Sequence, residues 1–478
     1  MNTNRNLWGL AALGLLLAGA PACNPLNQEV PTALTSAESY STADRISKAA
    51  VGMYDGLQNL EFLGGRALIY SDIRSDDLDP TPFFNDVATF SAQANSAIAT
   101  NAWTGGYRTI FQVNYFLQNL AANTGIAPAT LEAQYIGEGK FIRALTYFHL
   151  VNLYAQPYNF TANASHAGVP LQLTAPKDAA EAFASSQQLP RSTVAQVYAQ
   201  IDKDLSEALT GVPEGPTGTP SYNDVARVTK DAVRALQSRV ALYKGDYAGA
   251  VSAAAGVSAS RHQLNASPAV PFTAATYINS ESIFSVAMNN SDNPNTNNAL
   301  GAHYSSARRA DITVTPYALI PVAQFPAADA RRQLLSPSAV PANSTARIFT
   351  LKYNNGVSDY VPIVRYSEVL LNRAEGLAQT NAGISADAVG FLNQVRDRSK
   401  PSASASYTVS SFASKQALID AILLERRLEL AFEGHRYYDV LRYKQNPGRV
   451  NYGDNRVVLP IPLVDIQLNP NLVQNPGY

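Results

Sequence analysis

The segment KDAVRALQSRVALYKGDYAGAVSAAAGV constrains the fold more than any other part of this chain, because it contains two helical patterns joined by a turn. The first helix is predicted to end near Tyr243, the turn to lie at Lys244-Gly245-Asp246, and the second helix to begin at Tyr247. One such pair cannot bury its apolar face alone, so pairs of this kind stack on one another. The segment therefore predicts a helical scaffold built from several stacked pairs.

The same plan recurs in RYSEVLLNRAEGLAQTNAGISADAVGFLNQVRDR, with Asn381-Ala382-Gly383 as the turn. Both segments resemble tetratricopeptide units, in which small residues let paired helices approach closely. Two further pairs are predicted, one combining a helix near 47–60 with a helix over 107–120, the other combining 131–154 with 193–209. We therefore expect about four helical repeats, near 47–121, 131–209, 229–257 and 364–398.

Two long segments, near 60–100 and 257–350, show no sustained period and are rich in Asn, Ser, Pro, Thr and aromatic residues. Long irregular segments in a compact protein are usually functional or disordered. The sequence therefore predicts a mostly α-helical protein in which a single domain, 43–478, carries large irregular loops.

The amino terminus has the layout of a secretory signal, with a short polar start, an apolar core over 7–17 and small residues before Cys23. Cys23 is the only cysteine of the 478 residues, and an odd cysteine in an exported protein needs an explanation. The stretch resembles a bacterial lipoprotein signal. We expect residues 1–22 to be a signal peptide, Cys23 to carry the lipid and 23–42 to form a tether; an ordinary cleavage site with a chance cysteine is the alternative.

The overall charge argues against nucleic acid as a partner. The formal net charge is -1, from 36 basic and 37 acidic residues, so no general polyanion-binding surface is implied. The 5 histidines are scattered without metal-ligand spacing, and no phosphate-binding loop is present. We therefore expect no cofactor and no structural zinc site, and the sequence leaves open whether a calcium ion is bound.

Two charged stretches invite a catalytic interpretation. SDIRSDDLDP offers Asp72, Asp76, Asp77 and Asp79 as a glycosidase acid pair, but a solvated turn with helix caps and ion pairs is the interpretation we favour. LLERRLELAFEGHRYYD offers His435 as a proton carrier, yet Arg426 and Glu429 stand three residues apart on one helix and can simply pair. Both stretches therefore predict structural charge networks, and we expect no enzymatic activity.

Several motifs in order along the chain are similar to those of one family. They are RALTYFHLVNLYAQPY, ESIFSVA, the Asp329-Ala330-Arg331-Arg332 step, VPIVRYSEVLLNRAEGLAQ, LNQVRDR, LLERRLELAFEGHRYYDVLRY and LPIPLVDIQLNPNLVQNPGY. Together they resemble SusD/RagB-family lipoproteins. The resemblance implies a SusD-like fold on the cell surface, anchored by lipid in the outer membrane. It also implies a SusC-like TonB-dependent transporter as partner and a glycan captured by the loops.

Glycan binding needs aromatic rings to cover the apolar faces of sugars and polar side chains to satisfy their hydroxyls. The candidates are Phe83, Phe84, Trp103 and Tyr304. Core packing is the alternative for each, and for Trp103 it is as well supported as ligand contact. A secreted helical glycoside hydrolase or lyase, or a protein-binding tetratricopeptide adaptor, remain the alternatives for the whole chain.

Overall fold

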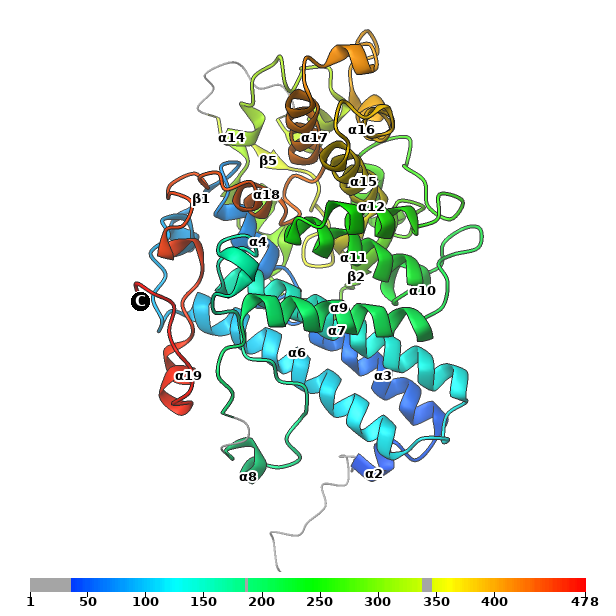
Figure 1. The fold of residues 1–478 in the computed structure, drawn as a ribbon, viewed down its shortest axis with the longest axis vertical. Coiled ribbons are helices and arrows are strands. Elements are labelled where there is room, and N and C mark those ends of the chain that lie inside the picture. Colours follow the sequence, from blue (N-terminus) through cyan, green and yellow to red (C-terminus); the bar gives the residue numbers. More distant parts are fainter. Residues whose placement is uncertain (1–35, 185–187, 338–345) are drawn as a thin grey trace, which may run out of the picture.

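Packed helix pairs form the scaffold of this protein, whose computed structural model describes residues 36–184, 188–337 and 346–478 (Figure 1). The pairs are α3 (Ala43–Leu57) with α6 (Ala97–Ala122), α7 (Ala129–Tyr154) with α9 (Val194–Gly211), α11 (Lys230–Lys244) with α12 (Tyr247–Ala255), and α15 (Tyr366–Thr380) with α16 (Ala386–Ser399). Successive pairs pack against one another, because α6 contacts α7, α9 contacts α11, and α12 contacts α15. The four predicted pairs are therefore confirmed.

Local signals explain where these helices begin and end. Gly245 follows α11 in the left-handed region, with φ of 75°, a conformation that glycine adopts without steric cost. Asp246 then caps α12, because its side chain accepts a hydrogen bond from the Gly249 N–H at 2.9 Å. Thr193 and Gln196 form a capping box at the start of α9. The turn predicted at Lys244-Gly245-Asp246 is therefore present.

Small residues bring the helices of the scaffold into close contact. A Cβ atom on Gly106 of α6 would lie 2.6 Å from Leu150 Cδ2 of α7. A Cβ atom on Gly211, at the end of α9, would lie 2.0 Å from the Ala133 carbonyl oxygen of α7. The backbone contact at Gly211 leaves no room for a side chain, whereas a side chain at Gly106 would have to displace Leu150.

The two segments predicted as irregular contain more regular structure than expected. The short elements between the pairs are α4 (Arg66–Ile73), α5 (Asn85–Ala88), α8 (Ala179–Ala182), α10 (Tyr222–Ala226), α13 (Leu300–Tyr304), α14 (Thr315–Ala318), α17 (Lys415–Glu429), α18 (Arg436–Arg442) and α19 (Leu463–Leu468), with α2 (Ser36–Ser39) preceding the scaffold. Every residue of α4 is buried, so its sequence has no polar face and no helical period. The helix α6 also begins at Ala97, ten residues before its predicted start.

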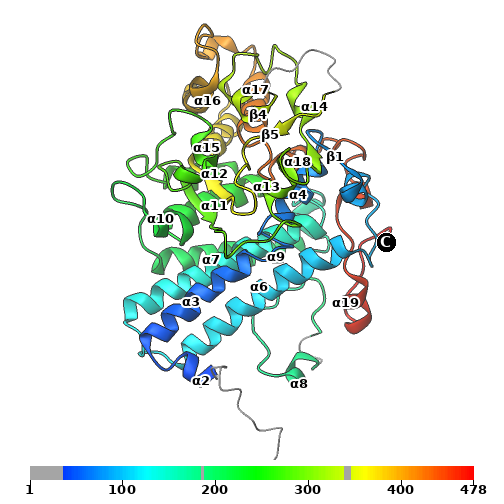
Figure 2. The same ribbon diagram turned by 180° about the vertical axis from the view of Figure 1, so that it is seen from behind.

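Three two-stranded antiparallel sheets connect distant parts of the described chain. They pair β1 (Asp79–Pro80) with β3 (Ile312–Thr313), β2 (Ser282–Val286) with β6 (Val361–Arg365), and β4 (Leu335–Ser336) with β5 (Phe349–Thr350). The β1–β3 pairing holds the chain before Phe83 beside the chain after Arg309. Figure 2 shows α4, α13 and β1 in the same region of the molecule.

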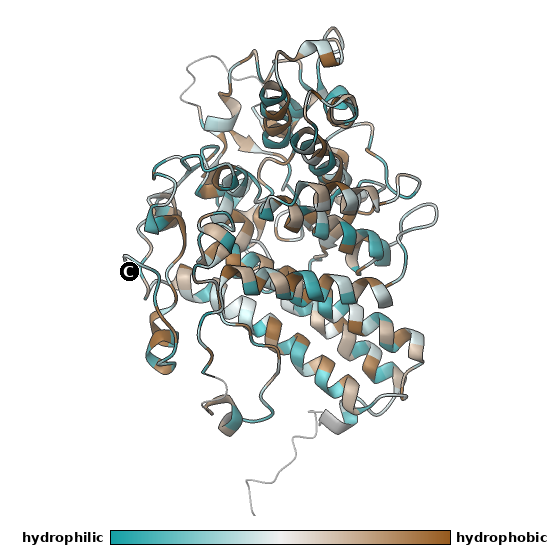
Figure 3. Cartoon of the chain, in the orientation of Figure 1, coloured by the Kyte–Doolittle hydropathy of each residue, from teal (hydrophilic) through white to brown (hydrophobic). Residues whose placement is uncertain are grey.

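The helices of the scaffold carry both hydrophobic and hydrophilic residues, as expected for helices with one buried face (Figure 3). No helix within the described ranges is long and apolar enough to cross a bilayer. Cys23, the predicted lipid attachment site, and most of the tether lie outside the described residues.

Candidate functional site

The four predicted aromatic contacts divide into exposed and buried side chains. Phe83 lies in a short 3-10 turn, Pro82–Phe84, and is 45% exposed. The next residue, Phe84, has an exposed fraction of 0%, as does Tyr304 on α13. A buried ring offers no face to a ligand. The prediction for Phe84 and Tyr304 as platforms is therefore wrong, because both rings pack in the interior.

Tyr304 shows why its ring lies inside. Its hydroxyl donates a hydrogen bond to Asp72 Oδ2 at 2.9 Å, and its ring lies 5.5 Å from that of Tyr353 and 6.1 Å from that of Phe432. The Asn-rich loop before it ends at α13, a helix whose residues are all buried. The polar loop therefore leads into the core rather than to the surface.

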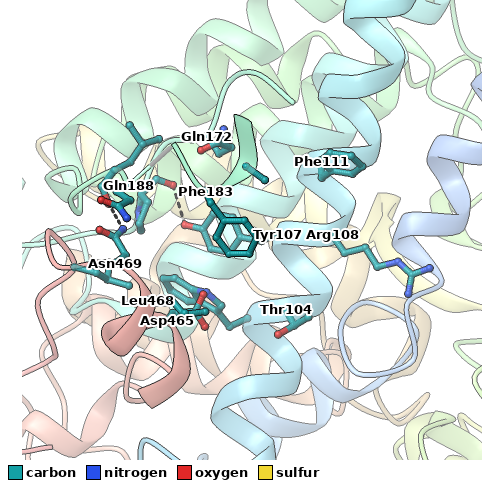
Figure 4. Close-up of a pocket in the computed structure, with 15 residues that line it drawn as sticks. Thr104, Tyr107, Arg108, Phe111, Gln172, Phe183, Gln188, Asp465, Leu468 and Asn469 are labelled. Atoms are coloured by element: carbon teal, nitrogen blue, oxygen red, sulfur yellow. Dashed lines mark hydrogen bonds between the residues drawn. The ribbon is translucent and has the colours of Figure 1, made fainter. Parts of the chain in front are cut away.

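Trp103 lies within α6 rather than in a loop, and it is 4% exposed. Its ring packs against Tyr107 at 4.7 Å and Tyr154 at 5.0 Å between centroids. The ring also borders a cavity of about 610 Å³ between α6, the α8 region and α19, which we call the α6–α19 cavity (Figure 4). Trp103 therefore combines core packing with an edge on a cavity.

The α6–α19 cavity has an aromatic and aliphatic lining with a few polar groups. Its rings come from Trp103, Tyr107, Phe111 and Phe183, and its polar side chains include Gln172, Gln188, Asp465 and Asn469. Burial raises the pKa of the Asp465 carboxyl, and the Trp103 indole partly offsets this effect. Phe183 is 74% exposed and Leu468 is 61% exposed, so the mouth of the cavity is an apolar surface.

A second aromatic surface surrounds Phe83, and we call it the Phe83 surface (Arg66, Phe83, Asn297, His303 and Arg309). The guanidinium of Arg309 lies 4.4 Å from the centre of the Phe83 ring, and that of Arg66 lies 5.3 Å from it. The imidazole of His303 stacks on the same ring with centroids 5.6 Å apart. These contacts bring cation–π and stacking interactions to one half-exposed phenyl ring.

Hydrogen bonds hold the groups of the Phe83 surface in place. Arg309 Nη1 donates to Asn297 Oδ1 at 3.0 Å, Arg66 Nη2 donates to the Asn297 carbonyl, and His303 Nε2 lies 2.8 Å from that carbonyl oxygen. Asp311 Oδ2 accepts a hydrogen bond from Arg309 Nε at 2.7 Å and lies 2.9 Å from His303 Nδ1. Burial raises the pKa of Asp311, but these bonds outweigh it and hold the pKa below its usual range.

Backbone contacts fix the two chain segments that build this surface. The Thr81 N–H donates to the Asp311 carbonyl at 2.6 Å, and the Thr81 hydroxyl donates to Asp311 Oδ1 at 3.2 Å. The β1–β3 pairing places Pro80 opposite Ile312. Phe83 and Arg309 are therefore held by a common framework rather than by free loops.

Two buried polar atoms in or next to the Phe83 surface have no hydrogen-bond partner among the described residues. Arg66 is 7% exposed, and its Nε lacks a hydrogen-bond partner among the described residues. The Oδ1 atom of Asn298, which is 4% exposed, lacks one as well. Unpaired buried polar atoms are costly, and such groups often await a ligand or an ordered water.

Sequence reasoning missed Arg66, Asn297, His303 and Arg309. In the polar stretch NNSDNPNTNNALGAHYSS, only Tyr304 was a candidate. The nearby Arg308 and Arg309 could also have indicated the site. Two neighbouring cations at the end of an amide-rich loop are a reasonable indication of an oxyanion or sugar contact.

The acidic stretch around Asp76 is built as a set of ion pairs. Asp76 accepts a hydrogen bond from Arg436 Nε at 2.8 Å, and Asp77 accepts one from Arg427 Nε at 2.8 Å. The expected ion pairs are therefore confirmed. The expected solvation is correct for Asp76 and Asp79, which are exposed, and wrong for Asp72 and Asp77, which are each 2% exposed. Within the described ranges, no group of three or more acidic, histidine or cysteine side chains is arranged to hold a metal.

The stretch around α17 forms a buried charge network. Arg365 of β6 binds Glu433 at 2.8 Å, Glu429 at 3.1 Å and Glu281 at 2.5 Å. The network joins β6 to the residue before β2 and to the end of α17 with the turn after it, so the structural interpretation is confirmed. The predicted pairing of Arg426 with Glu429 is wrong: Arg426 binds Asp439 at 3.1 Å, and Glu429 binds Arg398 at 2.5 Å.

Comparisons with known proteins agree over most of the chain. A model of the SusD family matches residues 349–478, and a model described as starch-binding associating with outer membrane matches residues 58–242. SusD-like protein P25 of Formosa agariphila is 25% identical, over 96% of this chain and 97% of that protein. SusD-like protein P2 of the same organism is 36% identical over 26% of this chain and 28% of that protein.

Solved structures show the same fold. A SusD superfamily protein from Bacteroides fragilis is 28% identical and has a TM-score of 0.79, covering 90% of this chain and 99% of that chain. The predicted mostly helical SusD-like fold is therefore confirmed. With its two family matches and a relative aligned along nearly its whole length, this chain belongs to the SusD/RagB family, a non-catalytic glycan-binding family.

Proposed function

We propose that this protein captures oligosaccharide or polysaccharide at the cell surface and delivers it to a SusC-like TonB-dependent transporter in the outer membrane. The family model matching residues 58–242 is described by starch binding and association with the outer membrane, which supports both the ligand class and the place. Cys23 would carry the lipid anchor, and residues 43–478 would act as one binding unit.

The observation that carries the proposal is the half-exposed Phe83 ring, held rigidly between guanidinium and amide groups. Sugars present flat C–H faces that stack on such a ring, while their hydroxyls need donors and acceptors in fixed directions. Arg309 and Asn297 supply such groups within hydrogen-bonding distance of each other. We therefore assign the first sugar contact to Phe83.

Trp103 keeps a secondary place in the proposal. Its ring is almost fully buried, so a ligand in the α6–α19 cavity would meet Tyr107 and Phe183 before it met Trp103. The cavity mouth is more apolar than the Phe83 surface. We therefore rank the Phe83 surface first as the sugar-binding site.

The test compares single alanine variants at the two aromatic surfaces. Full-length protein in detergent is screened against neutral and acidic polysaccharides by affinity gel electrophoresis. Phe83→Ala is expected to weaken binding about tenfold with unchanged melting temperature. A tenfold loss, about 1.4 kcal/mol, corresponds to roughly 60 Å² of apolar contact at about 25 cal/mol per Å².

Tyr222→Ala, at a 52% exposed ring on α10, is the matched control and should bind normally. If Phe183→Ala abolishes binding and Phe83→Ala does not, the α6–α19 cavity is the sugar site. Absence of binding to every polysaccharide tested would contradict the proposed function itself.

A further inference from the structure

Two arginines contact Phe83 and two more lie on the adjoining chain segments, and we call these four the arginine cluster (Arg66, Arg308, Arg309 and Arg347). Arg66 and Arg309 contact the Phe83 ring directly. Arg308 is the exposed neighbour of Arg309, and Arg347 Nη2 donates to the carbonyl of Ala310, the residue after Arg309. All four positive charges therefore lie on or beside the loop that ends at Asp311.

The cluster has little compensating negative charge. Asp311 is the carboxylate that contacts it, and it pairs with Arg309 at 2.7 Å. Among the described residues, Arg66, Arg308 and Arg347 form no ion pair with any carboxylate within 4.0 Å. Buried arginines of the scaffold differ: Arg143 binds Asp204 at 2.7 Å, and Arg239 binds Glu368 at 2.5 Å.

Arg66 adds a second, independent observation. Its side chain is 7% exposed, its Nε is unpartnered, and its Nη2 donates to a backbone carbonyl, that of Asn297. A buried guanidinium without a carboxylate is expensive to maintain. An oxyanion that arrived at the Phe83 surface would lower that cost through charge-assisted hydrogen bonds.

The overall charge of the chain does not indicate this local excess of positive charge. Its formal net charge is -1, which argues against a general polyanion-binding surface. Two positive charges contact the Phe83 ring instead, and Arg308 and Arg347 add two more on the adjoining chain. A site of that kind favours ligands that combine a flat apolar face with a negative substituent.

We infer that the Phe83 surface selects anionic glycans, in which a carboxylate or sulfate group binds the arginine cluster while the sugar ring stacks on Phe83. This inference rests on the proposed function and names the substrate class of the same site. The exposed Arg308 guanidinium offers planar, paired donors, which suit both carboxylate and sulfate oxygens.

The experiment measures affinity of the full-length protein in detergent for polygalacturonate, dextran sulfate and neutral dextran, at low and high salt. At least one anionic polymer should bind more tightly than dextran, and its affinity should fall with salt. The double variant Arg308→Gln with Arg347→Gln should weaken that binding tenfold or more at an unchanged melting temperature. The two anionic polymers distinguish carboxylate from sulfate recognition.

Lys48→Gln is the matched control, because Lys48 is a cation on α3 with a 76% exposed side chain, and it should bind as the unmodified protein does. Equal loss of anionic binding in Lys48→Gln and in the double variant would overturn the inference, since binding would then follow total charge. Phe83-dependent binding of dextran without binding of either anionic polymer would overturn the inference and leave the proposed function intact. Absence of any Phe83-dependent binding would overturn both.

Discussion

Asp72 and Tyr304 form a hydrogen-bonded pair inside the protein, joining α4 to α13. The Gly434 N–H also donates to Asp72, at 2.9 Å to Oδ1. Burial raises the pKa of Asp72 to about 8, although both hydrogen bonds oppose this effect. The carboxyl group therefore keeps its proton at neutral pH while the protein is folded.

This protonation predicts a pH-dependent stability that Asp72→Asn removes. The unfolded chain loses the proton near pH 4, whereas the folded protein holds it to about pH 8. The contribution of Asp72 to stability is therefore complete below about pH 4 and is lost as the pH rises to about 8. Relative to Asp72→Asn, the free energy of unfolding should fall by up to about 1.4 kcal/mol per pH unit in this window.

Urea denaturation of both proteins across this pH range measures the difference. An amide keeps the shape of the neutral carboxyl group without a proton to lose: its oxygen can accept from the Gly434 N–H, and its NH2 group can donate to the Tyr304 hydroxyl oxygen. Parallel stability profiles for the two proteins would mean that Asp72 is ionised in the folded state.

Adjacent phenylalanines show the limit of sequence reasoning at the scale of residues. Phe83 and Phe84 have the same chemistry and adjoin each other in the sequence, yet one is 45% exposed and the other is fully buried. The choice depends on the direction in which a three-residue turn meets the core, and that direction comes from tertiary packing. An aromatic pair in a polar segment therefore predicts a site without saying which ring forms it.

Two glycines in neighbouring helices give a matched test at the scale of elements. A Cβ atom on Gly376 of α15 would lie 2.8 Å from the Tyr247 carbonyl oxygen, whereas a Cβ atom on Gly390 of α16 meets nothing within 4 Å. Gly376→Ala should destabilise the protein by about 1–3 kcal/mol, because α12 and α15 must separate. Gly390→Ala should stabilise it by about 0.5–1 kcal/mol, because alanine favours the helix.

Thermal and denaturant unfolding of the two variants measures both effects. Since the substitution is the same, helix propensity favours alanine at both positions, and only the contact with α12 separates them. If Gly376→Ala stabilised the protein, α12 and α15 would have space between them for a methyl group.

Helices with one exposed face were predictable, and helices without one were not. Apolar residues at helical spacing, with glycine or polar residues at the helix ends, predict four of the helices: α11, α12, α15 and α16. α4 was missed because it is buried on all sides, and the first half of α6 because Thr104, Gly105 and Gly106 interrupt the apolar pattern. Apolar and polar residues alternate with the helical period only where one face of the helix meets water. A helix that is buried on all sides therefore lacks this pattern.

At the scale of the molecule, we predict that one residue, Cys23, holds the protein at the membrane. We expect Cys23→Ser to lose fatty-acid labelling and to leave the membrane fraction, because a lipid attached there would be the anchor. Phe83→Ala, which leaves the amino terminus unchanged, is the control and should stay with the membrane. Labelling that persists in Cys23→Ser would place the lipid elsewhere or exclude it.

The Phe83 surface draws its side chains from parts of the chain more than 200 residues apart, Arg66 and Phe83 on one side and Asn297 to Arg309 on the other. A nascent chain that has not yet reached residue 297 contains the first helix pairs but only half of this surface. Contacts so distant in sequence form late, after the intervening chain has been ordered. We therefore predict that a nascent or truncated copy that stops before residue 297 does not bind glycan at this surface, so that binding there would report that both halves of the protein have joined.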